Sequence, residues 1–160
     1  MTQNASPRIL LFDDDDFAIR SLQEYLTKQV GWHVDLAADA GLLERLMHER
    51  YDLLLVDSMI HTQGELNGQP VRNVEFPGVV WRKTGLEFLR RLRRGEYSGP
   101  AGTAPDVPVI ILSAIMGPSI EKELGSEVMV EAMFEKPFTL EDLVSDMCRL
   151  LKEKCNVLSP

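Results

Sequence analysis

Three short apolar runs constrain the fold of this 160-residue chain more than any other feature. They read RILLF (8–12), DLLLV (52–56) and VPVIIL (107–112), and each is continuous rather than alternating. Continuous apolar character is typical of parallel strands that helices cover on both faces. Shorter strands are expected at 32–36, where apolar and polar residues alternate, and at 132–134.

Helical patterns lie between these runs. Apolar residues recur at helical spacing within 19–26, 42–47, 86–92 and 140–150, and a weaker pattern covers 119–130. Thr139 is the expected N-cap of the last helix, because acidic residues follow it in the first turn. Strands that alternate with helices predict an α/β, doubly wound parallel sheet, which binds ligands at the carboxyl ends of its strands.

Composition and charge exclude several classes of function. The chain has 17 Lys and Arg against 25 Asp and Glu, a formal charge of -8, which argues against nucleic-acid binding and suits a protein that holds cations. The basic residues at 90–94 surround a helical stripe and predict a solvated helix face. No apolar run approaches the ~18 residues of a membrane span, and the N-terminus has no signal pattern.

The two cysteines, Cys148 and Cys155, bear on the compartment. Their spacing places both on one helical face, which favours reduced thiols over a disulfide or a metal site. We therefore expect a cytoplasmic protein with no membrane partner.

One segment is longer than a simple alternation of strands and helices requires. Residues 61–84 form an insertion after the third strand, and within it VRNVEFPGVVWR (71–82) predicts a small β-hairpin on Pro77-Gly78. The insertion would serve either as a lid or partner-docking surface, or as an excursion that packs on its own side chains. The remainder indicates a single domain over residues 1–160.

Polar side chains follow the buried strands at the point where each ends. Asp13 and Asp14 follow the first strand, Asp57 the third, Ser113 the fourth and Lys136 the fifth. Because the carboxyl ends of parallel strands meet at one edge of a sheet, these groups are expected to converge. Carboxylates are the hard oxygen ligands that Mg²⁺ prefers, and an ammonium neutralises phosphoryl oxygens. The pattern therefore predicts a magnesium-dependent phosphoryl-transfer site.

The segments that carry these groups are ILLFDDDD, YDLLLVDSM, VPVIILSA and FEKPF, in that order. Together they resemble the receiver domain of two-component response regulators, over about Arg8 to Leu151 apart from the insertion. The resemblance implies a flavodoxin-like fold of five parallel strands and five helices. It also implies two partners: a histidine kinase or phosphotransfer protein as phosphodonor, and a downstream protein target.

Carried over residue by residue, the resemblance implies a role for each strand-end group. Asp57 would be the phosphoacceptor, forming an acyl phosphate. Mg²⁺ would be held by Asp13, Asp14, Asp57 and the backbone carbonyl of Met59. Lys136 would pair with the phosphoryl oxygens, and Ser113 would donate its hydroxyl to one of them. We expect self-catalysed phosphorylation and slow autodephosphorylation rather than an enzyme acting on other substrates.

The chain departs from the family pattern at several positions. Met133 stands where the family usually has an aromatic residue, three positions before the lysine. Met59 and Ile115 flank the expected phosphoryl position and are apolar, so we expect them not to orient an attacking water. The proline common shortly after the phosphoacceptor is also missing, and Ile60-His61 stands in its place.

The Lys136-Pro137 dipeptide belongs to the matching FEKPF segment, and it invites a cis peptide bond that would aim the lysine into the cleft.

Two alternative functions are compatible with the same residues. LLFDDDD also resembles the first motif of haloacid-dehalogenase-type phosphatases, with Asp13 as nucleophile and Asp15 as acid/base, although Asp57 would then have no role. The chain would otherwise be a pseudo-receiver, a binding module that never turns over phosphate. The alternatives differ in which aspartate becomes phosphorylated.

Overall fold

The computed structural model describes residues 6–13, 16–37, 41–57, 63–66, 69–72, 84–113 and 128–152. Strands and helices alternate along most of the chain. In order they are β1 (Arg8–Phe12), α1 (Asp16–Tyr25) with its π-helical continuation η1 (Leu26–Val30), β2 (His33–Ala37), α2 (Gly41–His48), β3 (Leu53–Asp57), β4 (Gln63–Leu66), β5 (Gln69–Arg72), α3 (Thr84–Arg93), β6 (Val109–Ser113), β7 (Ala132–Glu135) and α5 (Leu140–Leu151).

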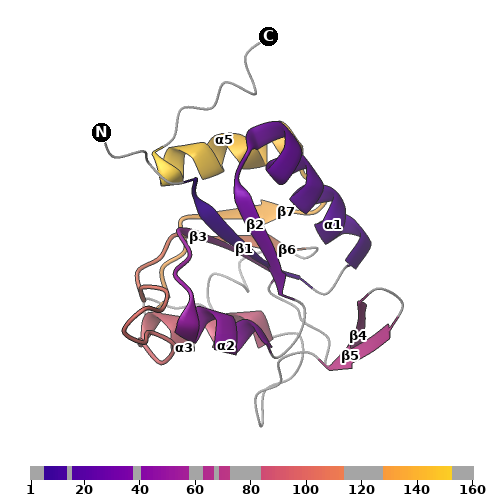
Figure 1. Ribbon diagram of the computed structural model, residues 1–160. Coiled ribbons are helices and arrows are strands. Elements are labelled where there is room, and N and C mark those ends of the chain that lie inside the picture. The colour runs from indigo at the N-terminus through magenta and orange to yellow at the C-terminus, as the bar shows by residue number, and fades with distance from the viewer. Residues whose placement is uncertain are drawn as a thin grey trace.

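Five of the strands form one parallel sheet in the order β2-β1-β3-β6-β7 (Figure 1). This order confirms the flavodoxin-like, doubly wound fold predicted from the sequence. The order reverses at β1, with β2 on one side and β3 on the other, and such a reversal opens a crevice at the carboxyl ends of the strands. The five predicted strands each coincide with an observed one to within two residues.

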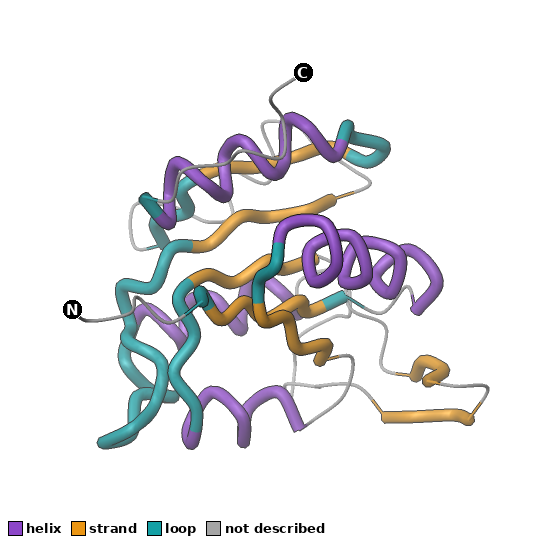
Figure 2. Tube along the Cα trace, turned by 45° about the horizontal axis from the view of Figure 1, so that its top comes forward, coloured by secondary structure: helices purple, strands orange, loops and turns teal. Residues whose placement is uncertain are grey.

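Alternating side chains of the strands supply two hydrophobic cores, one on each face of the sheet. On one face, Leu10 and Phe12 of β1 pack with side chains of α2 and α3. On the other, Ile9 and Leu11 pack with side chains of α1 and α5. Figure 2 shows the strands lying between these two layers of helices. Burial on both faces explains why the strands read as continuous apolar runs.

Arg93 holds the amino-terminal ends of β6 and β7 against α3. Its guanidinium donates to the carbonyl oxygens of Pro105 (2.9 Å), Val107 (2.6 Å) and Met129 (3.0 and 2.6 Å). Its side chain is only 11% exposed. Burial lowers the Arg93 pKa, although the negative charge of Glu131 acts to raise it. The prediction of a solvated face at the end of α3 is therefore wrong for Arg93, because neighbouring loops bring carbonyl acceptors over it.

α5 begins as predicted and ends before the second cysteine. The hydroxyl of Thr139 accepts from the backbone N–H of Asp142 at 3.2 Å, which confirms the N-cap. At the other end Lys152 has a left-handed φ of 57° and terminates the helix. Cys148 is disulfide-bonded, so the prediction of reduced thiols is wrong. The spacing argument assumed a helix that runs on to Cys155, whereas α5 stops at Leu151.

The insertion contains a β-hairpin, but not where the sequence analysis placed it. β4 and β5 are antiparallel, with Gln63 opposite Arg72 and Leu66 opposite Gln69, and they lie to one side of the main sheet (Figure 1). Arg72 therefore pairs within this earlier hairpin, and the later strand and turn that the sequence predicts lie outside the described residues. The missed signal is Asn67-Gly68, a favoured dipeptide for a two-residue connection.

Two expected segments lie wholly or largely outside the described residues. These are the predicted turn at Pro77-Gly78 and most of the predicted helix at 119–130, of which residues 128–130 are not helical. Among the helices in the described ranges, none has both the length and the apolar character needed to cross a membrane.

Candidate functional site

The carboxyl ends of β1, β3, β6 and β7 bring four of the predicted groups to one edge of the sheet. Asp13 directly follows β1, and Asp57 is the last residue of the adjacent strand β3. Lys136 follows β7, and its backbone N–H donates to the carbonyl of Ser113 at 2.8 Å. The peptide bond between Lys136 and Pro137 is cis, as the sequence suggested. Strand pairing alone thus places these side chains together.

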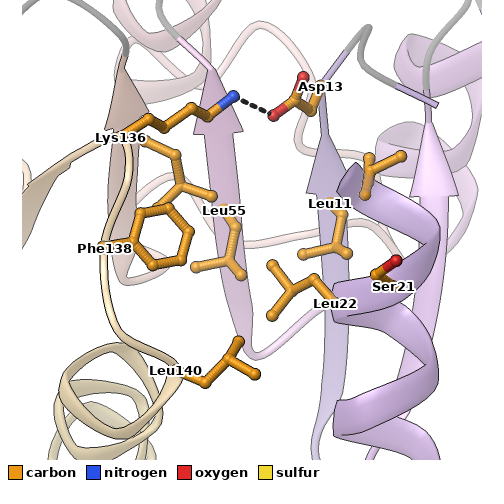
Figure 3. A pocket seen from close by; sticks show the side chains of 10 residues that line it. Leu11, Asp13, Ser21, Leu22, Leu55, Lys136, Phe138 and Leu140 are labelled. Atoms are coloured by element: carbon orange, nitrogen blue, oxygen red, sulfur yellow. Dashed lines mark hydrogen bonds and ion pairs between the residues drawn. The ribbon is translucent and has the colours of Figure 1, made fainter. Parts of the chain in front are cut away.

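The ammonium of Lys136 joins the two carboxylates. It donates to Oδ2 of Asp13 at 2.7 Å, the contact drawn in Figure 3, and to Oδ2 of Asp57 at 3.3 Å. The side chains of Asp13 and Asp57 are 8% and 9% exposed, and that of Lys136 is 25% exposed. Residues separated by more than 120 positions in the chain therefore form one largely buried ionic cluster.

Electrostatics keep Lys136 charged in spite of its burial. Desolvation lowers the Lys136 pKa, but the charges and hydrogen bonds of Asp13 and Asp57 outweigh that effect and raise the pKa above its usual value. The cluster thus contains two carboxylates and one ammonium. All three groups lie in a partly desolvated setting, where charges interact more strongly than in water.

This charge balance bears on the predicted magnesium ion. Asp13 and Asp57 supply hard oxygen donors at the carboxyl edge of the sheet, the kind of ligand that Mg²⁺ prefers. In the part of the chain that the structure describes, no three His, Cys, Asp or Glu side chains gather as a metal site. The other two predicted ligands, Asp14 and Met59, lie outside the described residues. The residues present fit Mg²⁺ as two of its protein ligands.

The structure also places Ser113, the predicted hydroxyl residue, and the two residues at and beside the expected aromatic position, Met133 and Phe134. Ser113 is fully buried at the end of β6, in register with Glu135 of β7. Met133 packs on the α2 and α3 face of the sheet. The neighbouring Phe134 lies on the opposite face, where its ring meets that of Phe138 at 6.0 Å. Phe134 therefore lies on the other face of the sheet from Met133, which stands at the sequence position where an aromatic residue was expected.

An apolar pocket beside the cluster escaped sequence analysis. Asp13 and Lys136 line it together with side chains from β1, α1, β3, β6 and the start of α5 (Figure 3). No local pattern marks such a space, because its walls come from segments far apart in the chain.

Comparison with known proteins places the chain among signalling proteins. No family model matches it. Response regulator MprA of Mycobacterium tuberculosis (strain ATCC 25618 / H37Rv) is 31% identical over 148 residues, which is 92% of this chain and 51% of MprA. MprA of Mycobacterium ulcerans (strain Agy99) matches to the same extent. The chain thus spans about half the length of these curated relatives.

Solved structures share the fold. The receiver domain of Francisella response regulator 1452 has a TM-score of 0.65 at 22% identity, covering 92% of this chain and 98% of that one. Chemotaxis protein CheY4 of Vibrio cholerae has a TM-score of 0.63 at 22% identity, and the match covers 91% of this chain and 99% of CheY4. The receiver domain of sensor histidine kinase PA1611 from Pseudomonas aeruginosa, described with a magnesium ion in its active site cleft, has a TM-score of 0.63 at 21% identity, covering 93% and 100%.

Proposed function

The chain is a response regulator receiver domain of two-component signalling, and from this premise we propose that Asp57 accepts a phosphoryl group in a Mg²⁺-dependent reaction. The observation that carries the proposal is the ammonium of Lys136, which Asp13 and Asp57 share at 2.7 and 3.3 Å. A phosphoryl group needs a nucleophilic oxygen with cationic charge beside it, and this cluster supplies both.

The chemistry follows from the positions of these groups. A carboxylate oxygen of Asp57 attacks phosphorus, forming an O–P bond of an acyl phosphate while the bond from phosphorus to the donor nitrogen breaks. The Lys136 ammonium, already within reach of Asp57, pairs with a phosphoryl oxygen as negative charge gathers there. Bound Mg²⁺ neutralises phosphoryl charge, and Asp13 and Asp57, with the expected ligands Asp14 and Met59, would hold it. The magnesium described for the Pseudomonas receiver domain supports this choice of metal.

Contact geometry favours Asp57 over Asp13 as the acceptor. Lys136 holds Asp13 by the shorter contact, 2.7 Å against 3.3 Å, so this ammonium engages the Asp13 carboxylate more strongly than that of Asp57. Under the phosphatase alternative Asp57 would have no role, although it shares the lysine. The resemblance to response regulators over 92% of the chain also supports Asp57.

Phosphorylation would act through the neighbouring strand ends. Ser113 is buried at the end of β6, and its carbonyl oxygen accepts a hydrogen bond from the backbone N–H of Lys136. A new phosphoryl group on Asp57 would therefore shift the conformational equilibrium of the end of β6 and of the start of the β7–α5 connection. A bias of ~5.5 kcal/mol changes a two-state population from 1:99 to 99:1. A histidine kinase or phosphotransfer protein is the proposed donor, and a downstream protein is the proposed target.

Mass spectrometry after phosphorylation tests the proposal. The protein is incubated with MgCl₂ and acetyl phosphate, and the modified residue is located by peptide mapping. We expect the label on Asp57, and its loss in Asp57→Asn and on chelation with EDTA. Asp52→Asn, the same substitution at the other end of the β3 segment, is the matched control and should retain the label. A label on Asp13 would establish the phosphatase alternative, and no label would establish the pseudo-receiver.

The lifetime of the acyl phosphate is a separate expectation. Met59 and Ile115 are apolar, so hydrolysis should be slow, and Met59→Asn should accelerate it by giving the attacking water a polar partner. Phosphate release after removal of the donor measures both rates. Equal rates in the two proteins would contradict the role assigned to Met59.

A further inference from the structure

Three aromatic rings from separate segments of the chain pack against one another behind the end of β1. The rings of Phe12 in β1 and Phe88 in α3 meet edge to face, with centroids 5.3 Å apart and an interplanar angle of 76°. The ring of Tyr97, in the connection from α3 to β6, stacks on Phe88 at 5.4 Å and 18°. Both separations lie within the ~4.5–7 Å that aromatic pairs prefer. We call these three rings the aromatic column.

The aromatic column belongs to the hydrophobic core on the α2 and α3 face of the sheet. Phe12 and Phe88 are 1% and 0% exposed, and Tyr97 is 7% exposed. The Tyr97 hydroxyl has no hydrogen-bond partner among the described residues, so packing of its ring holds this side chain in place. Because protein interiors are close-packed and transmit strain, the position of each ring depends on that of the next.

One end of the aromatic column adjoins the acceptor site. Phe12 is the last residue of β1, and it lies opposite Val56 of β3 in the parallel ladder. Asp13 and Asp57 directly follow these two residues in the chain. The position of Phe12 against β3 therefore sets the distance between the backbone segments that carry the two carboxylates.

Residues that lie behind metal ligands orient those ligands and thereby tune the affinity for the metal. We propose that Phe88 is a positioning residue for the magnesium site: by packing on Phe12 it fixes Asp13 relative to Asp57, and Tyr97 supports Phe88 in turn. The inference rests on the proposed function in one respect only, that Asp13 and Asp57 are ligands of Mg²⁺. It does not depend on transfer of a phosphoryl group.

The test is a calorimetric titration of the full chain with MgCl₂, without a phosphodonor. Phe88→Leu keeps a large apolar side chain but removes the ring that meets Phe12. We expect this variant to bind Mg²⁺ about tenfold more weakly than the wild type, which is the lower end of the effect of changing a residue behind a metal ligand. Circular dichroism establishes that each variant is folded at the temperature of the titration.

Leu92→Ala is the matched control for loss of core packing. Leu92 is 1% exposed and lies in the same helix and the same core as Phe88. It adjoins Arg93, whose guanidinium reaches Pro105 and Val107 at the opposite, amino-terminal end of β6. Leu92→Ala should therefore lower the stability of the protein, because a cavity is left in the core, and should retain the wild-type affinity for Mg²⁺.

Two variants of Tyr97 separate the ring from the hydroxyl. Tyr97→Phe keeps the stacked ring and should bind Mg²⁺ as the wild type does. Tyr97→Leu should weaken binding by a smaller factor than Phe88→Leu, because it acts through Phe88. Equal affinities of the wild type and Phe88→Leu, or equal weakening in Leu92→Ala, would overturn this inference and leave the labelling of Asp57 unaffected. A wild type that binds no Mg²⁺ would overturn both this inference and the metal dependence of the proposed function.

Discussion

Replacing Lys136 by methionine removes an ammonium that contacts both Asp13 and Asp57. The substitution keeps most of the apolar stem, so the packing around it changes little. Two nearly buried carboxylates then lose the ammonium that both of them contact. We expect the variant to be less stable than the wild type in the absence of Mg²⁺.

The size of the loss follows from burial. Removing one partner of a buried ion pair costs ~3–5 kcal/mol, and the lower end applies because the Lys136 side chain is 25% exposed. A loss of about 3 kcal/mol is a large share of the ~5–15 kcal/mol that stabilises a typical domain. Mg²⁺ should restore much of it, because a ligand at a hundredfold excess over its dissociation constant stabilises the folded state by ~2.7 kcal/mol.

Urea unfolding followed by circular dichroism, with and without MgCl₂, measures the effect. Lys28→Met is the matched control, since Lys28 pairs with Glu24 at 2.6 Å but both side chains are more than 60% exposed. Its free energy of unfolding should match that of the wild type, because exposed pairs contribute little. Equal losses in the two variants would refute the reasoning that burial, rather than contact distance, determines the contribution of the lysine.

Three further substitutions test the contacts described above, each by the same unfolding assay. Tyr97→Phe should stabilise the protein by ~1 kcal/mol, because the Tyr97 hydroxyl is buried and has no hydrogen-bond partner among the described residues. Tyr51→Phe should instead destabilise it by ~1–2 kcal/mol, because that hydroxyl has carboxylate acceptors of Glu49 and Asp35 at 2.8 and 2.9 Å and donates its one hydrogen to them. Thr139→Ala should lower the free energy of unfolding by ~1 kcal/mol through loss of the α5 N-cap. Thr139→Ser should retain most of that stability, because the serine hydroxyl can also cap the helix.

Local patterns accounted for most of the fold. The three central strands β1, β3 and β6 were recognised because burial on both faces leaves a continuous apolar run, as in RILLF of β1. The convergence of Asp13, Asp57 and Lys136 was also predictable, because parallel strands end at a common edge. The hairpin of β4 and β5 was not predicted, because Val71 and Arg72 suit more than one strand pairing and only the tertiary contacts show that they pair with β4.

The sequence by itself determined the layered sheet and the identity of the groups at its carboxyl edge, since both follow from periodicity along the chain. Only the tertiary structure decided that Lys136 holds two carboxylates at once, that Arg93 is covered by carbonyl oxygens, and that a pocket remains between α1 and α5. Those features depend on distances between segments that no local pattern records. Packing of the whole chain sets those distances, and they determine which charged groups meet at the site and how much space remains beside them.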